Sequence, residues 1–503
     1  MVEKLLMAQM TPRAILLATT AAAGLTSVTL AAPNLVTNGG FETGDLTGWV
    51  NGGAGSNYVS PIDPFGGSAY ALRGGCTSGP CTTTQTLNLQ PGIYKVDFQL
   101  NNEGGPNNSF SAKFNNVTTH TFSNSGPFAY THYSDVLAAS GSTDISFAIF
   151  QSPSWMNVDN VSVVQIDDGK GNNIAAASQT VASQMSREFM DRVFDRFGRS
   201  GSSMNMASAG EVVVASADGM SYSNSHGNYR AFINFYGDHA RWDSGDARSR
   251  RYGLMVGAEW APTQDFDLGI AFAAGHSFFR TETAFTLNHG DAEERAGAIY
   301  ANWSPVHSSF YATGVVGYGT STNDFTRDNI FGQVFANNVD STQWFGGLEA
   351  GFDVWKWSKT TLTPFARIEG ARVEQDGYAE GVTNGILVPA VVGDKDQTTG
   401  RSLLGLRATT EISVTPRPWQ ISAKAAWQHE FDRDRSVAFT ETTGPVSFSG
   451  VASGAVPVQD SAAVGLALEA PLDNNASLYL GYNGNFGDGQ IIHSGEAGFR
   501  VTW

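Results

Sequence analysis

The connections between the strand-like segments of residues 228–503 alternate in length, and this alternation is the strongest constraint on the fold. APTQD, SPVHS and SKT are short connections, whereas 320–341, 375–400 and 432–460 are long and follow the intervening segments. Short turns on one rim and long loops on the other are typical of outer-membrane β-barrels. We predict twelve antiparallel strands at 228–236, 251–261, 266–278, 292–303, 309–319, 342–356, 361–374, 401–414, 420–431, 461–470, 476–485 and 491–503.

Within these segments apolar and polar residues alternate, which is the period of a strand with two different faces. Leu404 and Leu406 share one face, and Arg407 lies on the other. Charges on the second face are costly toward lipid, so we expect a wet lumen to hold Glu349, Arg367, Glu369, Glu469 and Arg500. An interfacial aromatic girdle is expected at Trp260, Trp303, Trp355, Trp357, Trp419 and Trp503. A soluble β-sandwich or barrel is the alternative, but it explains neither the loop asymmetry nor the export signal described next.

The N-terminus has the pattern of a secretory signal peptide, which we place at 1–32. Lys4 and Arg13 precede an apolar run, and small residues follow up to Ala32. No later run of about 18 apolar residues predicts a transmembrane helix. The net charge of −17 argues against a nucleic-acid partner, because no basic face is available to neutralise phosphates.

Residues 33–166 read as an antiparallel β-sandwich, because short alternating segments recur between Gly, Pro and Asn punctuation. The two cysteines, Cys76 and Cys81, lie close together in an exported chain and predict one disulfide. Residues 167–227 form a linker with a helix at about 174–197, where Gly and Pro are absent and Glu188 and Arg192 are spaced i,i+4. The fold class is therefore all-β, with a helix that is long enough to cross a bilayer but too polar to face lipid.

The C-terminal 300 or so residues resemble the monomeric autotransporters. The resemblance rests on SQMSREFMDRVFDRFGR, on GLMVGAEWAPTQDFDLGIAFAAGHS, on the twelve strands and on the ending FRVTW. It implies a 12-stranded outer-membrane translocator whose lumen is threaded by an α-helix that joins the barrel to a passenger. It also implies insertion by the barrel-assembly machinery, which would recognise the terminal strand through Phe499, Val501 and Trp503.

The segments NLVTNGGFETGDLTGWV, LQPGIYKVDFQL and NVDNVSVVQI resemble galactose-binding-type jelly rolls of extracellular carbohydrate-binding modules. The resemblance implies a structural Ca²⁺ at Glu42 and Asp159, although these carboxylates could instead accept hydrogen bonds from loop amides. Flat aromatic faces for a glycan could come from Trp49, Tyr58, Tyr70, Tyr130 and Trp155, most of which we expect to serve in core or rim packing.

Catalysis by the passenger is not expected. Leu46 stands where the GDSL block of secreted lipases has its nucleophilic serine, and 33–166 contains no G-x-S-x-G elbow. His120 and His132 are present, but only geometry defines a triad. Some members of the resembled family release their passenger by asparagine cyclisation, and Asn172-Asn173 precedes the helix, but paired asparagines are also ordinary turn residues.

We therefore expect an outer-membrane autotransporter that displays a small β-sandwich on the cell surface. The sandwich is expected to bind a glycan or a host or other cell surface, as an adhesin does. A hydrolase passenger (esterase or protease) and a porin-like channel are the two alternatives.

Overall fold

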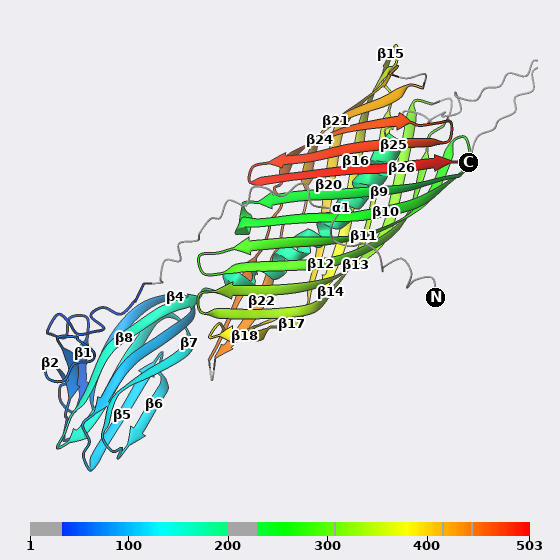
Figure 1. Cartoon of the computed structure of the whole chain (residues 1–503). Coiled ribbons are helices and arrows are strands. Elements are labelled where there is room, and N and C mark those ends of the chain that lie inside the picture. The colour runs from blue at the N-terminus through cyan, green and yellow to red at the C-terminus, as the bar shows by residue number, and fades with distance from the viewer. Residues whose placement is uncertain (1–32, 199–228, 306–307, 415–416, 444–445) are drawn as a thin grey trace, which may run out of the picture. The chain divides into compact units, whose positions relative to one another are not determined.

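The computed structural model describes residues 33–198, 229–305, 308–414, 417–443 and 446–503. Its strands form an N-terminal sheet, a closed barrel and a small sheet of loop strands (Figure 1). The predicted signal peptide and nearly all of the stretch 198–227 lie outside the described residues. No helix among the described residues is both long and apolar enough to cross a membrane.

The N-terminal part is an antiparallel β-sandwich, as predicted. Its strands are β1 (Val50–Gly53), β2 (Tyr58–Ser60), β3 (Ala71–Gly74), β4 (Cys81–Asn102), β5 (Asn107–Phe114), β6 (Val117–Ser123), β7 (Phe128–Ser152) and β8 (Met156–Asp167). The long strands β4 and β7 pair along most of their length, with a break in register between Leu89 and Gly92. Before the break β4 also pairs with β1, and after it with β8. The core between the two halves is rich in aromatic side chains, including Phe98, Phe110 and Phe147.

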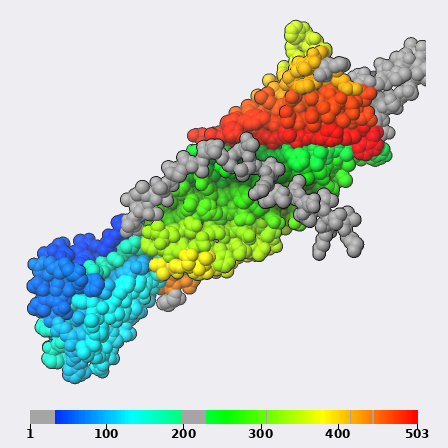
Figure 2. All heavy atoms as spheres, viewed as in Figure 1, coloured from blue at the N-terminus to red at the C-terminus, as the bar shows by residue number. Residues whose placement is uncertain are grey.

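The C-terminal part is a closed barrel of twelve antiparallel strands. They are β9 (Tyr229–Trp242), β10 (Ala247–Thr263), β11 (Phe266–Glu282), β12 (Leu287–Trp303), β13 (Phe310–Asn329), β14 (Gly332–Phe352), β16 (Thr360–Gln375), β20 (Lys395–Ile412), β21 (Trp419–Glu430), β24 (Asp460–Pro471), β25 (Ala476–Gly487) and β26 (Gln490–Thr502). The last strand pairs with the first, so the barrel has no free edge. Figure 2 shows this seam, where the red C-terminal strands lie against the green first strands.

Three of the loops predicted to be long are strands instead. The chain between β13 and β14 is a tight turn at residues 330–331, because both strands continue far beyond the predicted ends at 319 and 342. The same holds between β9 and β10 and between β11 and β12. Our prediction ended each strand where the outward face ceased to be apolar. Pairing continues past that point with outward polar residues such as Thr322 and Asp324, which suit strands that extend above the membrane.

Two long loops remain on that rim, and both contain short strands. The first carries β17 (Tyr378–Ala379), β18 (Gly381–Gly385) and β19 (Ala390–Val392), and the second carries β22 (Ser436–Thr443) and β23 (Val446–Ser453). Strands β17, β19, β22 and β23 form one small sheet, so the two loops are hydrogen-bonded to each other. On the opposite rim β15 (Trp355–Trp357) pairs with the start of β16.

The predicted inward and outward faces of the barrel strands are confirmed. Leu404 and Leu406 are more than half exposed on the outer wall, whereas Arg407, the residue after Leu406, is buried. The five charged residues predicted for the lumen are all at most 9% exposed. The tryptophans Trp260, Trp303, Trp355, Trp357 and Trp503 are exposed beside the short turns or the terminal strand.

Helix α1 (Asn173–Gly198) lies inside the barrel (Figure 1). Its bounds agree with the predicted 174–197 to within one residue at each end. Every described residue of the helix is buried apart from Asp191, which is half-buried. A helix so polar is stable there because its charged side chains find partners on the barrel wall.

Candidate functional site: the lumen, its outer exit and the sandwich

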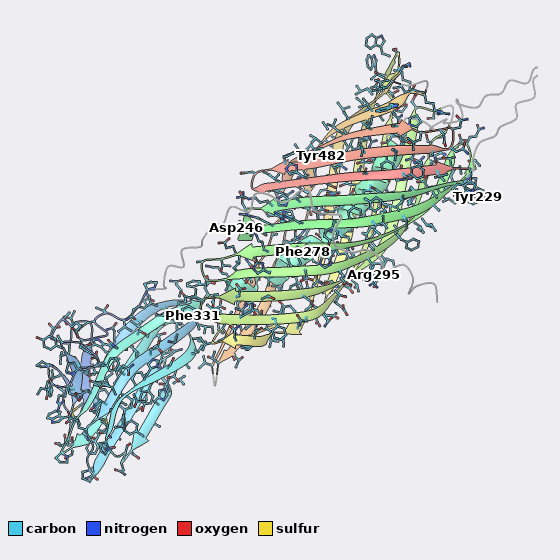
Figure 3. All side chains as sticks on the ribbon, viewed as in Figure 1. Tyr229, Asp246, Phe278, Arg295, Phe331 and Tyr482 are labelled. Atoms are coloured by element: carbon cyan, nitrogen blue, oxygen red, sulfur yellow. A yellow bond between two sulfur atoms is a disulfide. The ribbon has the colours of Figure 1, made fainter. Side chains whose placement is uncertain are left out.

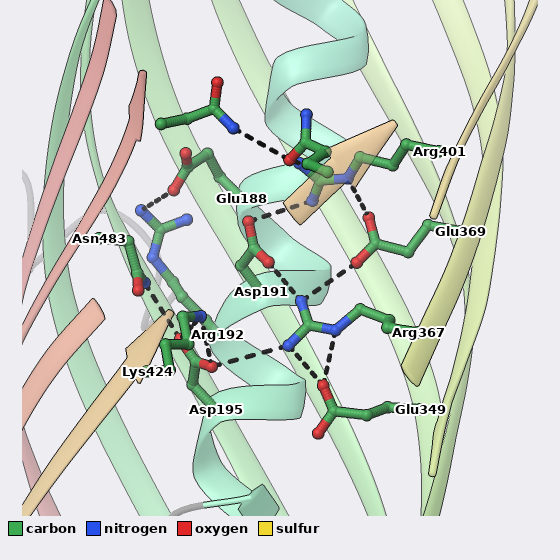
Figure 4. Close-up of polar contacts among 12 residues, drawn as sticks. Glu188, Asp191, Arg192, Asp195, Glu349, Arg367, Glu369, Arg401, Lys424 and Asn483 are labelled. Carbon is green, nitrogen blue, oxygen red and sulfur yellow. Dashed lines mark hydrogen bonds and ion pairs between the residues drawn. The ribbon is translucent and has the colours of Figure 1, made fainter. Parts of the chain in front are cut away.

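One face of α1 is joined to the barrel wall by ion pairs. Asp191 pairs with Arg367 on β16 and lies 3.1 Å from a guanidinium nitrogen of Arg401 on β20 (Figure 4). Asp195, one turn further along, is 2.7 Å from the amine of Lys424 and accepts a hydrogen bond from Asn483. The wall arginines are themselves held by wall carboxylates, since Arg367 pairs with Glu349 and Arg401 pairs with Glu369. These contacts fix the rotation and the height of the helix.

Other side chains of α1 are apolar and pack against the wall. Met185, Phe189 and Phe194 pack against inward side chains of β9 to β16. Phe189 lies 5.4 Å from Phe345, measured between ring centroids. The helix is therefore held in the lumen by apolar contacts as well as by ion pairs. A cavity of about 30 Å³ remains beside Gln184, Glu188 and Gln428, which is room for one or two water molecules.

The remaining arginines of α1 also have partners. Arg187 pairs with Glu430, and Arg196 lies 2.8 Å from Glu259. The predicted i,i+4 pair between Glu188 and Arg192 is present at 3.4 Å. The polar side chains of the helix thus fill the lumen and pair with its wall.

At the outer exit of the lumen the chain between sandwich and helix passes a fully buried arginine. Arg327, near the end of β13, pairs with Asp167, the last residue of β8. The same guanidinium lies 2.6 Å from Glu380 and 3.2 Å from Glu441, which come from the two long loops. We call Asp167, Arg327, Glu380 and Glu441 the exit cluster. It joins the end of the sandwich, one barrel strand and both loops through a single cation.

The two loops also pack on the linker backbone. Gly169 has a φ of 72°, and a Cβ built on it would lie 2.3 Å from Phe439 and 2.7 Å from Phe448. Only glycine fits there, for reasons of both conformation and space. On the other side of the exit, the backbone of Gly454 contacts the first turn of α1, and Thr180 donates a hydrogen bond to the Ala455 carbonyl. The loops thus close over the entrance of the helix.

Asn172 and Asn173, the candidate cleavage pair, are both buried at this exit. The Asn172 side chain donates to the Gly169 carbonyl and to Glu441. Asn173 accepts hydrogen bonds from Thr281 and Asn288 on the wall. Both side chains therefore have structural partners that anchor the start of the helix.

The predicted glycan-stacking residues of the sandwich fall into two groups. Trp49 is 5% exposed, packs between Phe41 and Phe147 in the core, and has no free face for a sugar; its inclusion in that prediction was wrong. Tyr58 is 41% exposed and meets the half-buried Trp155 edge to face at 5.6 Å.

The Tyr58–Trp155 pair is accompanied by charge. Arg73 lies 5.0 Å from the Trp155 ring and forms a 2.6 Å ion pair with Glu103. Tyr70 is half-buried against the core, and Tyr130 packs on Phe65 while its hydroxyl donates to the Asp63 carbonyl. The structure thus brings together only Tyr58 and Trp155 of the candidate set.

The predicted calcium ligands, Glu42 and Asp159, both accept hydrogen bonds from loop amides. Glu42 accepts from the amides of Ala69 and Tyr70, and Asp159 from those of Phe65 and Asn160. Burial raises the pKa of the Asp159 carboxyl, and the charge of Glu42 adds to that effect. Within the described part of the chain no group of three or more His, Cys, Asp or Glu converges as a metal site. A hard cation would fit the two carboxylates only if backbone carbonyls completed its shell.

The predicted disulfide between Cys76 and Cys81 is present. His120 and His132 each lie against a carboxylate, at 2.8 Å from Asp135 and 3.0 Å from Asp97. Neither imidazole has a serine hydroxyl within hydrogen-bonding distance among the described residues. The arrangement of a nucleophilic triad is therefore not formed at either histidine.

The terminal strand lies at the barrel seam. Phe499 and Val501 alternate with Arg500, which is inside the lumen 3.1 Å from Glu469. Trp503 exchanges two backbone hydrogen bonds with Tyr229, the first described residue of β9. Their rings stack at 6.4 Å between centroids.

Sequence reasoning missed the exit cluster. Arg327, Glu380 and Glu441 lie in segments that are predicted from the sequence as long loops. A signal was present, because an arginine and two glutamates flanked by valines and aromatics in long loops indicate that the loops pack. Their convergence on Asp167 depends on pairings between distant segments, which periodicity does not reveal.

A family model, Autotransporter beta-domain, matches residues 231–483. An extracellular serine protease of Serratia marcescens is 25% identical over 265 residues, and a second such protease is 29% identical over 166 residues. The matches cover 50% and 31% of this chain but only 23% and 14% of the proteases, so the chain spans at most about a quarter of those relatives.

Among solved structures, the translocator domain of the autotransporter NalP from Neisseria meningitidis superposes with a TM-score of 0.50. It is 14% identical, and the match covers 66% of this chain and 99% of that domain, which shows a shared fold. The closed barrel, the helix inside it and the matched β-domain are those of an outer-membrane translocator, and the chain belongs to the autotransporter family.

Proposed function

We propose that the barrel carries the N-terminal sandwich across the outer membrane and then holds it at the cell surface. The observation that carries this proposal is the continuous path from β8 through residues 168–172 into a helix enclosed by the barrel. The exit cluster supports retention, because it ties Asp167 to the barrel wall and to both outer loops. Insertion by the barrel-assembly machinery, after export by the signal peptide, completes the proposed route.

Retention is tested on whole cells. A protease added outside should cleave the sandwich from intact cells and leave a membrane-protected barrel, and mass spectrometry should recover the full mature chain before protease is added. A fragment ending near Asn172 in the culture supernatant would show instead that the passenger is cleaved and released.

We propose that the displayed sandwich binds a glycan, with the Tyr58–Trp155 pair as the apolar platform. Aromatic faces beside a buried arginine and a carboxylate provide both stacking and hydrogen bonds to hydroxyl groups. A glycan array probed with the full protein in detergent, with and without Ca²⁺, tests this function. Tyr58→Ala should abolish any signal, whereas Tyr70→Phe should preserve it. If Tyr58→Ala does not change the signal, the glycan binds elsewhere on the protein. If no glycan binds with or without Ca²⁺, the proposed glycan binding is wrong and only surface display of the sandwich is left.

A structural Ca²⁺ at Glu42 and Asp159 remains part of this proposal. It is supported by two neighbouring carboxylates of which one is fully buried. Calcium should raise the melting temperature of the wild-type sandwich and should not raise that of Asp159→Asn. An equal shift in both would show that calcium acts elsewhere.

A hydrolase passenger is the second candidate function, because the two Serratia relatives are described as extracellular serine proteases. A screen of the displayed sandwich with protease, esterase and glycosidase substrates tests for this activity.

The porin-like alternative is tested by conductance. We expect low conductance for the full chain and open pores only when 174–197 is deleted. Open pores in both would contradict a sealing helix.

A further inference from the structure

A cluster of outward-facing basic residues lies at one height on the outer wall of the barrel, across β26, β9, β10 and β11. Arg248 is directly opposite Arg241 on one side and Arg280 on the other. One rung lower, His239 lies between Arg250 and His493. We call Arg241, Arg248, Arg250, Arg280, His239 and His493 the basic rim.

The basic rim is unfavourable without an anion. Like charges directly opposite on neighbouring strands destabilise a sheet. Arg241 and Arg248 have exposed acidic neighbours, Asp243 at 3.3 Å and Asp246 at 3.5 Å. Arg250 and Arg280 are exposed and have neither an ion pair nor a side-chain hydrogen bond within the described part of the chain. Such a gathering is not expected from composition, because the whole chain carries a net charge of −17.

The height of the rim matches the outer surface of the membrane. His493 stands ten residues above Trp503, His239 ten above Tyr229 and Arg250 ten above Trp260. At about 3.3 Å per residue and a tilt of about 40°, ten residues rise roughly 25 Å, which is the height of the apolar band of such barrels. The rim therefore lies where lipid headgroups begin on the side opposite the short turns.

A mostly apolar hollow begins on β10 and β11, nearer the short turns than the rim, and extends across β12 and β13 to β14. It is lined by Leu254, Phe272, Gly297, Val316 and Tyr318, among others, and the charged Arg295 also contributes to the lining. Phe278 lies directly opposite Arg250 at the level of the rim, and Tyr252 is the next outward residue below Arg250; both rings are exposed on the outer wall (Figure 3 labels Phe278 on β11). A ligand that fills both regions needs an anionic head above and hydrocarbon below.

We propose that the basic rim binds the phosphorylated headgroup of an outer-leaflet glycolipid, with an acyl chain of that lipid in the hollow. Guanidinium groups bind phosphate oxygens by paired hydrogen bonds, and Arg250 and Arg280 are available for this. The bound phosphates offset the repulsion within the rim. The lipid thereby fixes the β9–β11 wall, next to the seam, in the membrane.

The proposal is tested by native mass spectrometry of the full chain released from detergent micelles, titrated with bisphosphorylated lipid A. We compare the wild type, the double variant Arg250→Gln/Arg280→Gln and a matched control, Arg372→Gln. Arg372 is also an exposed wall arginine, but Glu374 at 2.9 Å and Asp396 at 2.7 Å neutralise it. The heat-dependent mobility shift of the folded barrel confirms that each variant is folded.

One interfacial arginine contributes a factor of about five in affinity for an anionic lipid, so the double variant should bind about 25-fold more weakly. Arg372→Gln should bind as the wild type does, and Arg250→Lys/Arg280→Lys should recover most of the loss. Equal binding of dephosphorylated lipid A, or an equal loss in Arg372→Gln, would overturn the proposal. Full competition by millimolar inorganic phosphate would show a general anion site and overturn the assignment to a lipid.

Discussion

At the scale of single residues, the buried charge at the exit is out of balance. One guanidinium, that of Arg327, faces the carboxylates of Asp167, Glu380 and Glu441. Burial and the nearby charge of Asp167 raise the pKa of Glu441 to about 8. Glu441 is therefore protonated at neutral pH, and the cluster is stable because one of its three acids is neutral.

We expect the exit to loosen as the pH rises through about 8. Because the folded-state pKa of Glu441 is raised above its usual 4.5, its contribution to stability is complete below about pH 4.5 and disappears as the carboxyl ionises near pH 8. Hydrogen exchange of residues 166–173 should accelerate between pH 7 and 9 beyond the intrinsic rate. Glu441→Gln, which stays neutral, should remove this excess. The same pH profile in the variant would assign the titration to another group.

Removing the cation of the cluster should have a larger effect. Arg327→Gln leaves buried carboxylates without a partner, and breaking a buried pair in this way costs about 3–5 kcal/mol. Limited proteolysis should then cut the linker at 168–172 at a rate at least 100-fold higher, whereas Arg372→Gln, on the outer surface, should not change it. Unchanged cleavage in Arg327→Gln would mean that the loops hold the linker without this arginine.

At the scale of elements, the bounds of the helix could be predicted almost to the residue, but its contacts with the barrel wall could not. The run from Ile174 to Phe197 is free of Gly and Pro, and that local property defines its ends. Which wall receives Asp191 depends on Arg367 and Arg401, roughly 200 positions away and on strands whose register no local pattern fixes. The ends of strands such as β13 were missed for a related reason. The strands remain paired beyond the point where apolar and polar residues stop alternating, and that alternation was the signal used to predict them.

The charged face of α1 gives the prediction at this scale. Asp191→Ala/Asp195→Ala removes the helix side of the network and leaves Arg367, Arg401 and Lys424 facing each other. We expect the helix to leave its seat intermittently, so that single-channel recordings show openings that the wild type lacks. Asp168→Ala, beside an exposed lysine outside the lumen, serves as the control. If the double variant shows no openings, the apolar contacts and the remaining pairs of Arg187 and Arg196 retain the helix without these two aspartates.

At the scale of the whole molecule, the sequence predicts the architecture better than it predicts the surfaces. Twelve strands, a lumen lined with charge and a sandwich before the helix all follow from patterns of period two and from turn chemistry. The basic rim does not, because it arises only once the register places Arg248 between Arg241 and Arg280. The exit cluster does not either, because it brings Arg327 together with residues of β8 and of both long loops. For the sandwich, composition identified aromatic candidates, but only packing separates the buried Trp49 from the exposed Tyr58.

Closure of the barrel at its seam gives the last prediction. Trp503 contributes both backbone hydrogen bonds with Tyr229 and a ring stacked on that residue at the rim of short turns. Deleting Trp503 therefore opens one end of the seam and removes an interfacial anchor. We expect a marked loss of folded barrel in outer-membrane fractions, seen as lost heat-dependent mobility and lost surface labelling of the sandwich. Trp260→Ala removes a similarly exposed ring but no seam hydrogen bond, and it should reduce display much less. Normal display after deletion of Trp503 would show that the seam closes without its terminal pair.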